Sequence, residues 1–123
     1  MVRIVLFDDL LLYCFGMRNA LEKIPDIVVA GEANSEADLF EILDKTPVQI
    51  VLVGVNMPDY TGCVHIVKRL KSSYPHIKII SVADEDNAVA LQSMAEVGID
   101  GYIGKREATG HALAHMVLQV ANI

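Results

Sequence analysis

The sequence predicts an α/β fold, a five-stranded parallel sheet with helices on both faces. Short apolar runs alternate regularly with longer segments of helical period. The apolar runs are continuous and do not alternate with polar residues, which is typical of strands that are buried on both faces of a sheet. The chain has 123 residues, 53% hydrophobic and 21% charged, enough apolar surface for a core and too little charge for disorder. We therefore predict one domain over residues 1–123.

Five segments are short, rich in Val and Ile, and bounded by Asp, Pro, Gly or Asn, as strands are. They are Val2–Phe7, Ile27–Gly31, Gln49–Val53, Ile77–Val82 and Gly101–Gly104. The five segments between and after them place apolar residues at three- and four-residue intervals, which indicates helices with one buried face. They are Leu11–Ile24, Ser35–Lys45, Cys63–Ser73, Asp86–Val97 and Glu107–Ala121.

Residues at the boundaries support this division. Ser35 stands at the start of a helix with acidic residues in its first turn, which marks an N-terminus. Gly98 follows the fourth helix as its predicted C-cap. Pro25, Pro47 and Pro75 each lie just after a predicted helix end.

Charge and cysteine content narrow the function classes. With 16 acidic and 10 basic side chains the net charge is −6, so the domain has no electrostatic reason to hold a phosphate backbone and is not expected to read DNA itself. No apolar run approaches the roughly 18 residues of a membrane span, and we expect a cytoplasmic protein without membrane contact. Cys14 and Cys63 lack CxxC spacing, which suits buried or half-buried reduced thiols.

In an open parallel sheet the binding site lies beyond the carboxyl ends of the strands. Asp8 and Asp9 follow the first predicted strand, Ser81 lies near the end of the fourth, and Lys105 follows the fifth. Adjacent carboxylates suit a hard cation such as Mg²⁺. A lysine ammonium and a serine hydroxyl nearby suit a phosphoryl group.

In this order and spacing, these residues resemble the CheY-like receiver domain of two-component response regulators, over the whole chain. The resemblance rests on Phe7-Asp8-Asp9, Asn56-Met57-Pro58 with Gly62 following, Ser81-Val82, and Gly101-Tyr102-Ile103-Gly104-Lys105. The stretch from Pro25 to Ala33 resembles the subfamily that carries a C-terminal helix-turn-helix of the LuxR or NarL type. The resemblance implies a flavodoxin-like, doubly wound (βα)5 fold with strand order 2-1-3-4-5, and a DNA-binding domain that is not in this chain.

The resemblance also implies a role for each matched site residue. The metal ligands would be Asp8, Asp9 and the backbone carbonyl of Asn56. The residues for the phosphoryl group and the switch would be Ser81 as the switch hydroxyl, Tyr102 as the aromatic that turns inward on activation, and Lys105 as the phosphoryl contact.

One position departs from the family. Four residues before Pro58, where the family has its phospho-accepting aspartate, this chain has Gly54. Glycine offers no nucleophile, so phosphorylation at this position is excluded, and Mg²⁺ binding is expected to be weak. Either the natural protein is a receiver that works without phosphate, or the acceptor was replaced to lock the domain. Asp59 is an alternative acceptor, although its place before a Tyr-Thr-Gly sequence suits turn chemistry.

The site residues also have plainer interpretations. Lys105 would only pair with Asp8 and Asp9, which offsets the repulsion between two crowded carboxylates. Ser81 would be an ordinary hydrogen-bonded core serine. Tyr102 would be a strand-forming residue with a solvated hydroxyl.

Two helices are expected to form a surface for a partner. The buried stripe of the first predicted helix would comprise Leu10, Tyr13 or Cys14, Met17, Leu21 and Ile24, and that of the last Leu113, Met116, Val117 and Val120. Leu11 and Phe15 of the first helix would then face outward, as would Leu118 of the last. His111 and His115 would also face outward, and they are better explained as part of a solvated face than as metal ligands. The apolar residues suit a sensor histidine kinase, another signalling protein or a second copy of the chain.

We therefore predict a non-enzymatic receiver domain of a transcriptional regulator, whose output depends on conformational populations or partner binding. The alternative is a flavodoxin-like electron carrier. Such a carrier needs a Ser-, Thr- or Gly-rich loop after the first strand for the FMN phosphate, where this chain has Asp8-Asp9-Leu10-Leu11. A phosphatase or nucleotidase built on an acid pair is a third class, but the Asp-x-Asp spacing is absent here.

Overall fold

The computed structural model describes residues 1–55, 61–83 and 88–121. The strands are β1 (Val2–Phe7), β2 (Ile27–Ala33), β3 (Ile50–Val55), β4 (Lys78–Ala83) and β5 (Gly101–Gly104). The helices are α1 (Leu11–Leu21), α2 (Glu36–Lys45), α3 (Thr61–Ser73), α4 (Ala88–Val97) and α5 (Gly110–Ala121), with a short 3₁₀ helix, η1 (Lys105–Glu107), before α5. The strands form one parallel sheet in the predicted order β2-β1-β3-β4-β5. Within these ranges, no helix is long and apolar enough to cross a membrane.

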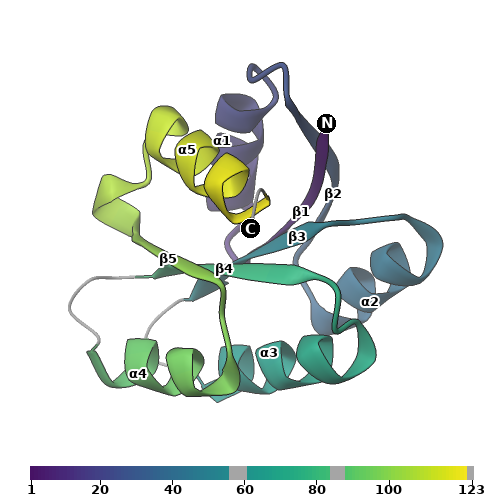
Figure 1. Ribbon diagram of the computed structural model, residues 1–123, viewed down its shortest axis with the longest axis vertical. Helices are drawn as coiled ribbons and strands as arrows, with labels where there is room; N and C mark the ends of the chain where they lie inside the picture. The colour runs from purple at the N-terminus through teal and green to yellow at the C-terminus, as the bar shows by residue number, and fades with distance from the viewer. Residues whose placement is uncertain (56–60, 84–87, 122–123) are drawn as a thin grey trace.

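The two faces of the sheet carry separate cores. Helices α1 and α5 lie on one face, and α2, α3 and α4 lie on the other (Figure 1). Successive residues of β1 point to opposite faces, so Ile4 and Leu6 pack beneath α1 and α5, whereas Val5 and Phe7 join the opposite cluster. Both faces are buried, which is why the strands appear in the sequence as continuous apolar runs.

Two predicted helix boundaries are confirmed in detail. The Ser35 hydroxyl accepts a hydrogen bond from the Asp38 amide at 3.2 Å and caps α2. Gly98 ends α4 with a φ of +104°, and its amide donates to the carbonyls of Met94 and Ala95. That left-handed backbone favours glycine.

The end of α1 differs from the prediction. The helix stops at Leu21, whereas the periodicity predicts Ile24. Pro25 disfavours helical backbone at the residue before it, and the Ile24 amide closes a turn on the Leu21 carbonyl at 3.1 Å.

Helix α5 also starts later than the sequence predicts, at Gly110 and not at Glu107. Residues Lys105–Glu107 form η1, and α5 begins at Gly110. The Thr109 hydroxyl accepts a hydrogen bond from the Ala112 amide at 3.1 Å, so Thr109 is the cap that the sequence analysis overlooked.

The strand ends extend further than predicted. β2 ends at Ala33 because it pairs with Phe7 at the end of β1, and β3 continues to Val55 because it pairs with Ala83 of β4. Helix α3 begins at Thr61, two residues before the predicted Cys63. The predicted start of the fourth helix at Asp86 lies outside the described residues.

Candidate functional site

Asp8, at the carboxyl end of β1, is fully buried. Its Oδ1 accepts a hydrogen bond from the Leu10 amide at 2.9 Å, an Asx turn that leads the chain from β1 into α1. Its backbone carbonyl accepts from the Asn34 side chain at 3.0 Å and from the Cys14 thiol at 3.6 Å. Asp9 is exposed, so the two adjacent carboxylates occupy different environments.

Gly54 lies beside Asp8 at the same edge of the sheet. β1 pairs with β3 so that Phe7 lies opposite Val53, and Asp8 and Gly54 are the next residues along the two chains. A β-carbon at position 54 would stand 2.5 Å from Asp8 Cγ and 3.0 Å from Asp8 Cβ, and closer still to Oδ2. The Asp8 carboxylate therefore occupies the space in which a side chain at position 54 would begin.

Lys105 brings positive charge to this carboxylate. Its Nζ lies 4.0 Å from Asp8 Oδ2, and its side chain is only 15% exposed. The same Nζ lies 4.6 Å from the centroid of the Tyr13 ring, within the range of a cation–π contact. The ion pair that the plainer interpretation of Lys105 expects with Asp8 is thus present.

Ser81 and Tyr102 lie opposite each other on β4 and β5. Ser81 is 1% exposed, and its hydroxyl has no hydrogen-bond partner within the described ranges. The hydrogen bond that the plainer interpretation expects is not present among these residues. Tyr102 is half-buried and packs against the core cluster beneath α2, α3 and α4.

Both cysteines contact the backbone of the site, which the sequence analysis missed. Cys14 and Cys63 are free thiols, as predicted. Cys14 donates to the Asp8 carbonyl, and Cys63 donates to the Gly54 carbonyl at 3.5 Å. Burial first, and then the nearby charge of Asp8, raises the pKa of the Cys14 thiol to about 11. Only the packing of α1 and α3 beside β1 and β3 could have located these thiols.

The described donor atoms fit a divalent cation poorly. No group of three or more His, Cys, Asp or Glu side chains within 1–55, 61–83 and 88–121 is placed to hold an ion. One carboxylate oxygen of Asp8 faces a backbone amide and the other faces an ammonium, while Asp9 is exposed and Gly54 offers no side-chain oxygen. Asn56, the third expected ligand, and Asp59, the alternative acceptor, lie outside the described residues.

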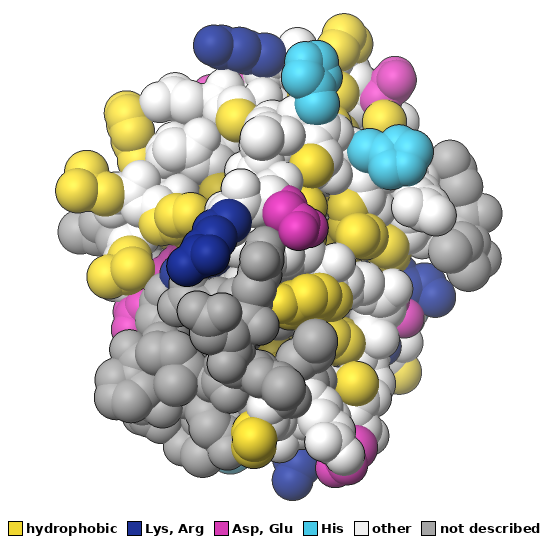
Figure 2. All heavy atoms as spheres, turned by 90° about the vertical axis from the view of Figure 1, so that its left-hand side faces the viewer, with side chains coloured by type: hydrophobic (Ala, Val, Ile, Leu, Met, Phe, Trp, Pro, Cys, Tyr) yellow, Lys and Arg dark blue, Asp and Glu magenta, His cyan; other side chains and the backbone are white. Residues whose placement is uncertain are grey.

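A second candidate surface lies at the start of α1. Leu10, Leu12 and Phe15 are 51%, 88% and 60% exposed, and we call these residues the α1 surface. Asp9, Leu10, Leu12 and Tyr13 line a hollow of about 540 Å³ there. Figure 2 shows hydrophobic side chains, in yellow, protruding at the left edge of the view. A cluster of this kind is a candidate contact for another protein.

The expectations for α1 are confirmed only in part. Cys14 is buried and Phe15 is exposed, as predicted. The prediction that Leu10 is buried is wrong, because Leu10 precedes the helix in an extended conformation and helical spacing does not reach it. The side chain of Leu11 is not among those that the structure describes.

The expectation for Leu118 is also wrong. Leu118 is half-buried and packs on the cluster beneath α5. Helix α5 packs against α1 as well as the sheet, so a wider arc of its surface is covered than its own periodicity indicates. His111 and His115 are exposed, as predicted.

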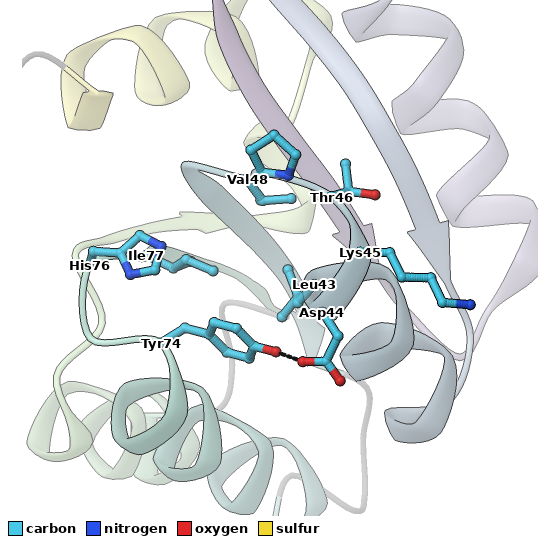
Figure 3. A pocket seen from close by; sticks show the side chains of 9 residues that line it. Leu43, Asp44, Lys45, Thr46, Val48, Tyr74, His76 and Ile77 are labelled. Carbon is cyan, nitrogen blue, oxygen red and sulfur yellow. Dashed lines mark hydrogen bonds between the residues drawn. The ribbon is translucent and has the colours of Figure 1, made fainter.

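A cavity of about 330 Å³ opens at the opposite edge of the sheet, among residues that precede β3 and β4. Figure 3 shows the Tyr74 hydroxyl directed at Asp44, to which it donates a hydrogen bond. Buried Leu43, Val48 and Ile77 contribute apolar lining. The Tyr74–Asp44 hydrogen bond ties the end of α2 to the loop before β4, a structural role.

The parallel sheet, its strand order, and the acid, hydroxyl and lysine at its carboxyl edge define the class as a receiver domain. The response regulator receiver domain family matches residues 4–117, and the chain belongs to this family. A flavodoxin-like electron carrier is correspondingly not favoured.

The particular relatives are transcriptional regulators. The transcriptional regulatory protein RcsB of Salmonella typhi is 27% identical over 109 residues, which cover 87% of this chain and 50% of RcsB. The transcriptional regulatory protein DegU of Brevibacillus brevis is 27% identical over 120 residues, which cover 98% of this chain and 50% of DegU. The chain therefore spans about half the length of these relatives.

Solved structures confirm the fold. The isolated REC domain of RcsB from Salmonella enterica serovar Typhimurium, in the presence of the phosphomimetic BeF3⁻, has a TM-score of 0.85 at 23% identity, covering 98% of this chain and 88% of that one. A structure of two RcsB dimers bound to two parallel DNAs has a TM-score of 0.87 at 24% identity, covering 98% and 61%.

Proposed function

We propose that this chain is the receiver domain of a two-component transcriptional regulator that acts without aspartyl phosphorylation. The observation that carries the proposal is the relation of Gly54 to Asp8. Gly54 stands four residues before Pro58, where the family resemblance implies the acceptor aspartate. The Asp8 carboxylate fills the space that an acceptor side chain would need.

The chemistry follows from this geometry. Formation of an acyl phosphate requires a carboxylate oxygen that attacks the donor phosphorus. Gly54 supplies none, and the Asp8 oxygens face the Leu10 amide and the Lys105 ammonium. We infer that partner binding or the population of conformers sets the output of the domain. Position 54 lacks a nucleophile whether glycine is the natural residue there or was put in place of an aspartate.

Mg²⁺ would neutralise charge at a phosphoryl group if it were bound beside Asp8 and Asp9. The described donors fit it poorly, and no step of the proposed function passes through it. Ser81, Tyr102 and Lys105 are proposed to act through their packing at the carboxyl edge.

The complete regulator is proposed to control transcription in the cytoplasm through a C-terminal helix-turn-helix domain. The support is that RcsB and DegU are named transcriptional regulatory proteins and are about twice as long as the matched region. A sensor histidine kinase or another signalling protein would contact the receiver. The α1 surface is a proposed contact for such a partner or for a second copy, and the RcsB dimers seen on DNA favour the second copy.

Intact mass after incubation with acetyl phosphate and Mg²⁺ tests the proposal. We expect an unchanged mass, whereas a stable adduct of about 80 Da, one phosphoryl group, would refute it. An adduct that disappears in Asp59→Asn would assign the alternative acceptor. BeF3⁻ should likewise leave the amide NMR spectrum unchanged, with the RcsB REC domain treated in parallel as the control for active reagent.

A further inference from the structure

We propose that Tyr13 is a positioning residue, whose ring holds the Lys105 ammonium over Asp8. Lys105 then serves as the built-in counter-ion of the buried carboxylate, in the place of a divalent cation. This inference rests on the proposed phosphate-independent function. It explains how the negative charge of Asp8 is compensated without a metal ion.

The three residues come from separate parts of the fold. Asp8 follows β1, Tyr13 lies on α1, and Lys105 begins η1 after β5. β3 and β4 lie between β1 and β5 in the sheet, so Lys105 reaches Asp8 across the carboxyl edge. Gly54 on β3 leaves open the space into which the Asp8 carboxylate turns.

A single turn of backbone fixes both the carboxylate and the ring. The Leu10 amide donates to Asp8 Oδ1 at 2.9 Å, and the Leu10 carbonyl accepts from the Tyr13 amide at 3.1 Å. These two hydrogen bonds to Leu10 therefore fix the position of the Tyr13 backbone relative to the Asp8 carboxylate. Tyr13 is half-buried, and its ring lies 4.6 Å from the Lys105 ammonium.

The contacts of Lys105 with Asp8 and with Tyr13 are complementary. A carboxylate with no exposure, such as Asp8, is costly to bury unless a positive charge compensates it. At 4.0 Å the ion pair is at the long limit for such pairs, and holding a lysine side chain in one rotamer opposes it entropically. The negative face of the ring, 4.6 Å from Nζ, attracts the ammonium and offsets that cost.

Magnesium alone is the probe for the first experiment, because a divalent cation would compete with Lys105 for the Asp8 carboxylate. Thermal unfolding is followed against MgCl2 for the wild type, Lys105→Met, Tyr13→Leu and Tyr13→Phe. We expect no midpoint shift in the wild type or in Tyr13→Phe, and a rise in Lys105→Met. Tyr13→Leu should also show a rise, smaller than that of Lys105→Met, because it loses one cation–π contact but keeps the lysine; no rise in Tyr13→Leu would remove the role of the ring.

An equal rise in the wild type and in Lys105→Met, or none in any variant, would overturn the inference. Tyr74→Leu, on the far edge of the sheet, is the matched control, and its unfolding midpoint should respond to MgCl2 as that of the wild type does.

Proton NMR gives a readout that loss of packing alone would not produce. The ε-methylene protons of Lys105 should lie upfield of those of the other lysines, because they sit in the ring current of Tyr13. The shift should persist in Tyr13→Phe and vanish in Tyr13→Leu. Unshifted Lys105 protons in the wild type, with no phosphoryl adduct, would refute this inference alone, whereas an adduct would refute the proposed function whatever the Lys105 shift.

Discussion

The carboxylate of Asp8 occupies the position at which a β-carbon on Gly54 would stand. A built β-carbon lies 2.5 Å from Asp8 Cγ, far inside van der Waals contact. The two positions are therefore coupled. Glycine at 54 lets Asp8 turn across the edge of the sheet toward Lys105, and any larger residue would force the carboxylate out of that position.

The first prediction follows from this coupling. Gly54→Ala should destabilise the domain by about 1–3 kcal/mol, the usual cost of overpacking a filled site, measured by denaturant unfolding. The double variant Asp8→Ala/Gly54→Ala should cost less than the sum of the two single changes, since it removes the clash.

Gly16→Ala is the matched control for Gly54→Ala. Gly16 is an exposed residue of α1, and a β-carbon there meets nothing within 4 Å. This change should stabilise the domain by roughly 0.5–1 kcal/mol through helix propensity. Equal effects of the two alanines would contradict the proposed clash at position 54.

The second prediction concerns the Ser81 hydroxyl, which is buried without a hydrogen-bond partner among the described residues. Ser81→Ala should leave stability unchanged or raise it by up to about 1 kcal/mol, because it removes an uncompensated polar group. Ser35→Ala, which deletes the cap of α2, should instead cost about 1 kcal/mol. A similar loss in both variants would show that the Ser81 hydroxyl has a partner.

The third prediction is a pH dependence that arises from Cys14. Its pKa is raised from 9.0 to about 11 in the folded protein, mainly by burial. At low pH the thiol is protonated in both states and its contribution to stability is complete. As pH rises from 9.0 through about 11, the unfolded chain ionises first, so the free energy of unfolding should fall by up to about 2–3 kcal/mol.

The comparison with Cys14→Ala isolates this effect, because tyrosines and lysines titrate in the same range. Urea unfolding at several pH values should give a shallower decline in Cys14→Ala than in the wild type. Parallel declines in the two proteins would rule out the raised pKa of Cys14.

The fourth prediction tests the α1 surface. Leu12→Ser/Phe15→Ser should change stability by less than about 0.5 kcal/mol, because both side chains are mostly exposed. If the surface joins two copies, light scattering should show a dimer for the wild type and for the control Lys68→Ser, an exposed residue of α3, and a monomer for the double variant. A dimer in all three, or a monomer in all three, would dismiss the second copy as the occupant.

The order of elements, the parallel sheet and the edge at which the site lies could all be predicted from the sequence. These features depend on local properties: runs of Val and Ile form strands, helical spacing marks the buried face of a helix, and single residues such as Ser35 and Gly98 end helices. Because sites lie beyond the carboxyl ends of parallel strands, the sequence also places Asp8, Ser81 and Lys105 at one edge, and the family resemblance implies a role for each.

The contacts between these residues could not be predicted, because they depend on how distant segments pack. Contact between Asp8, Gly54 and Lys105 depends on the register of β1 with β3 and on how far a side chain reaches across two strands. The covering of Leu118 likewise depends on the packing of α5 against α1. Periodicity shows which face of one element is apolar, but it holds no information on which side chains of distant segments share a space.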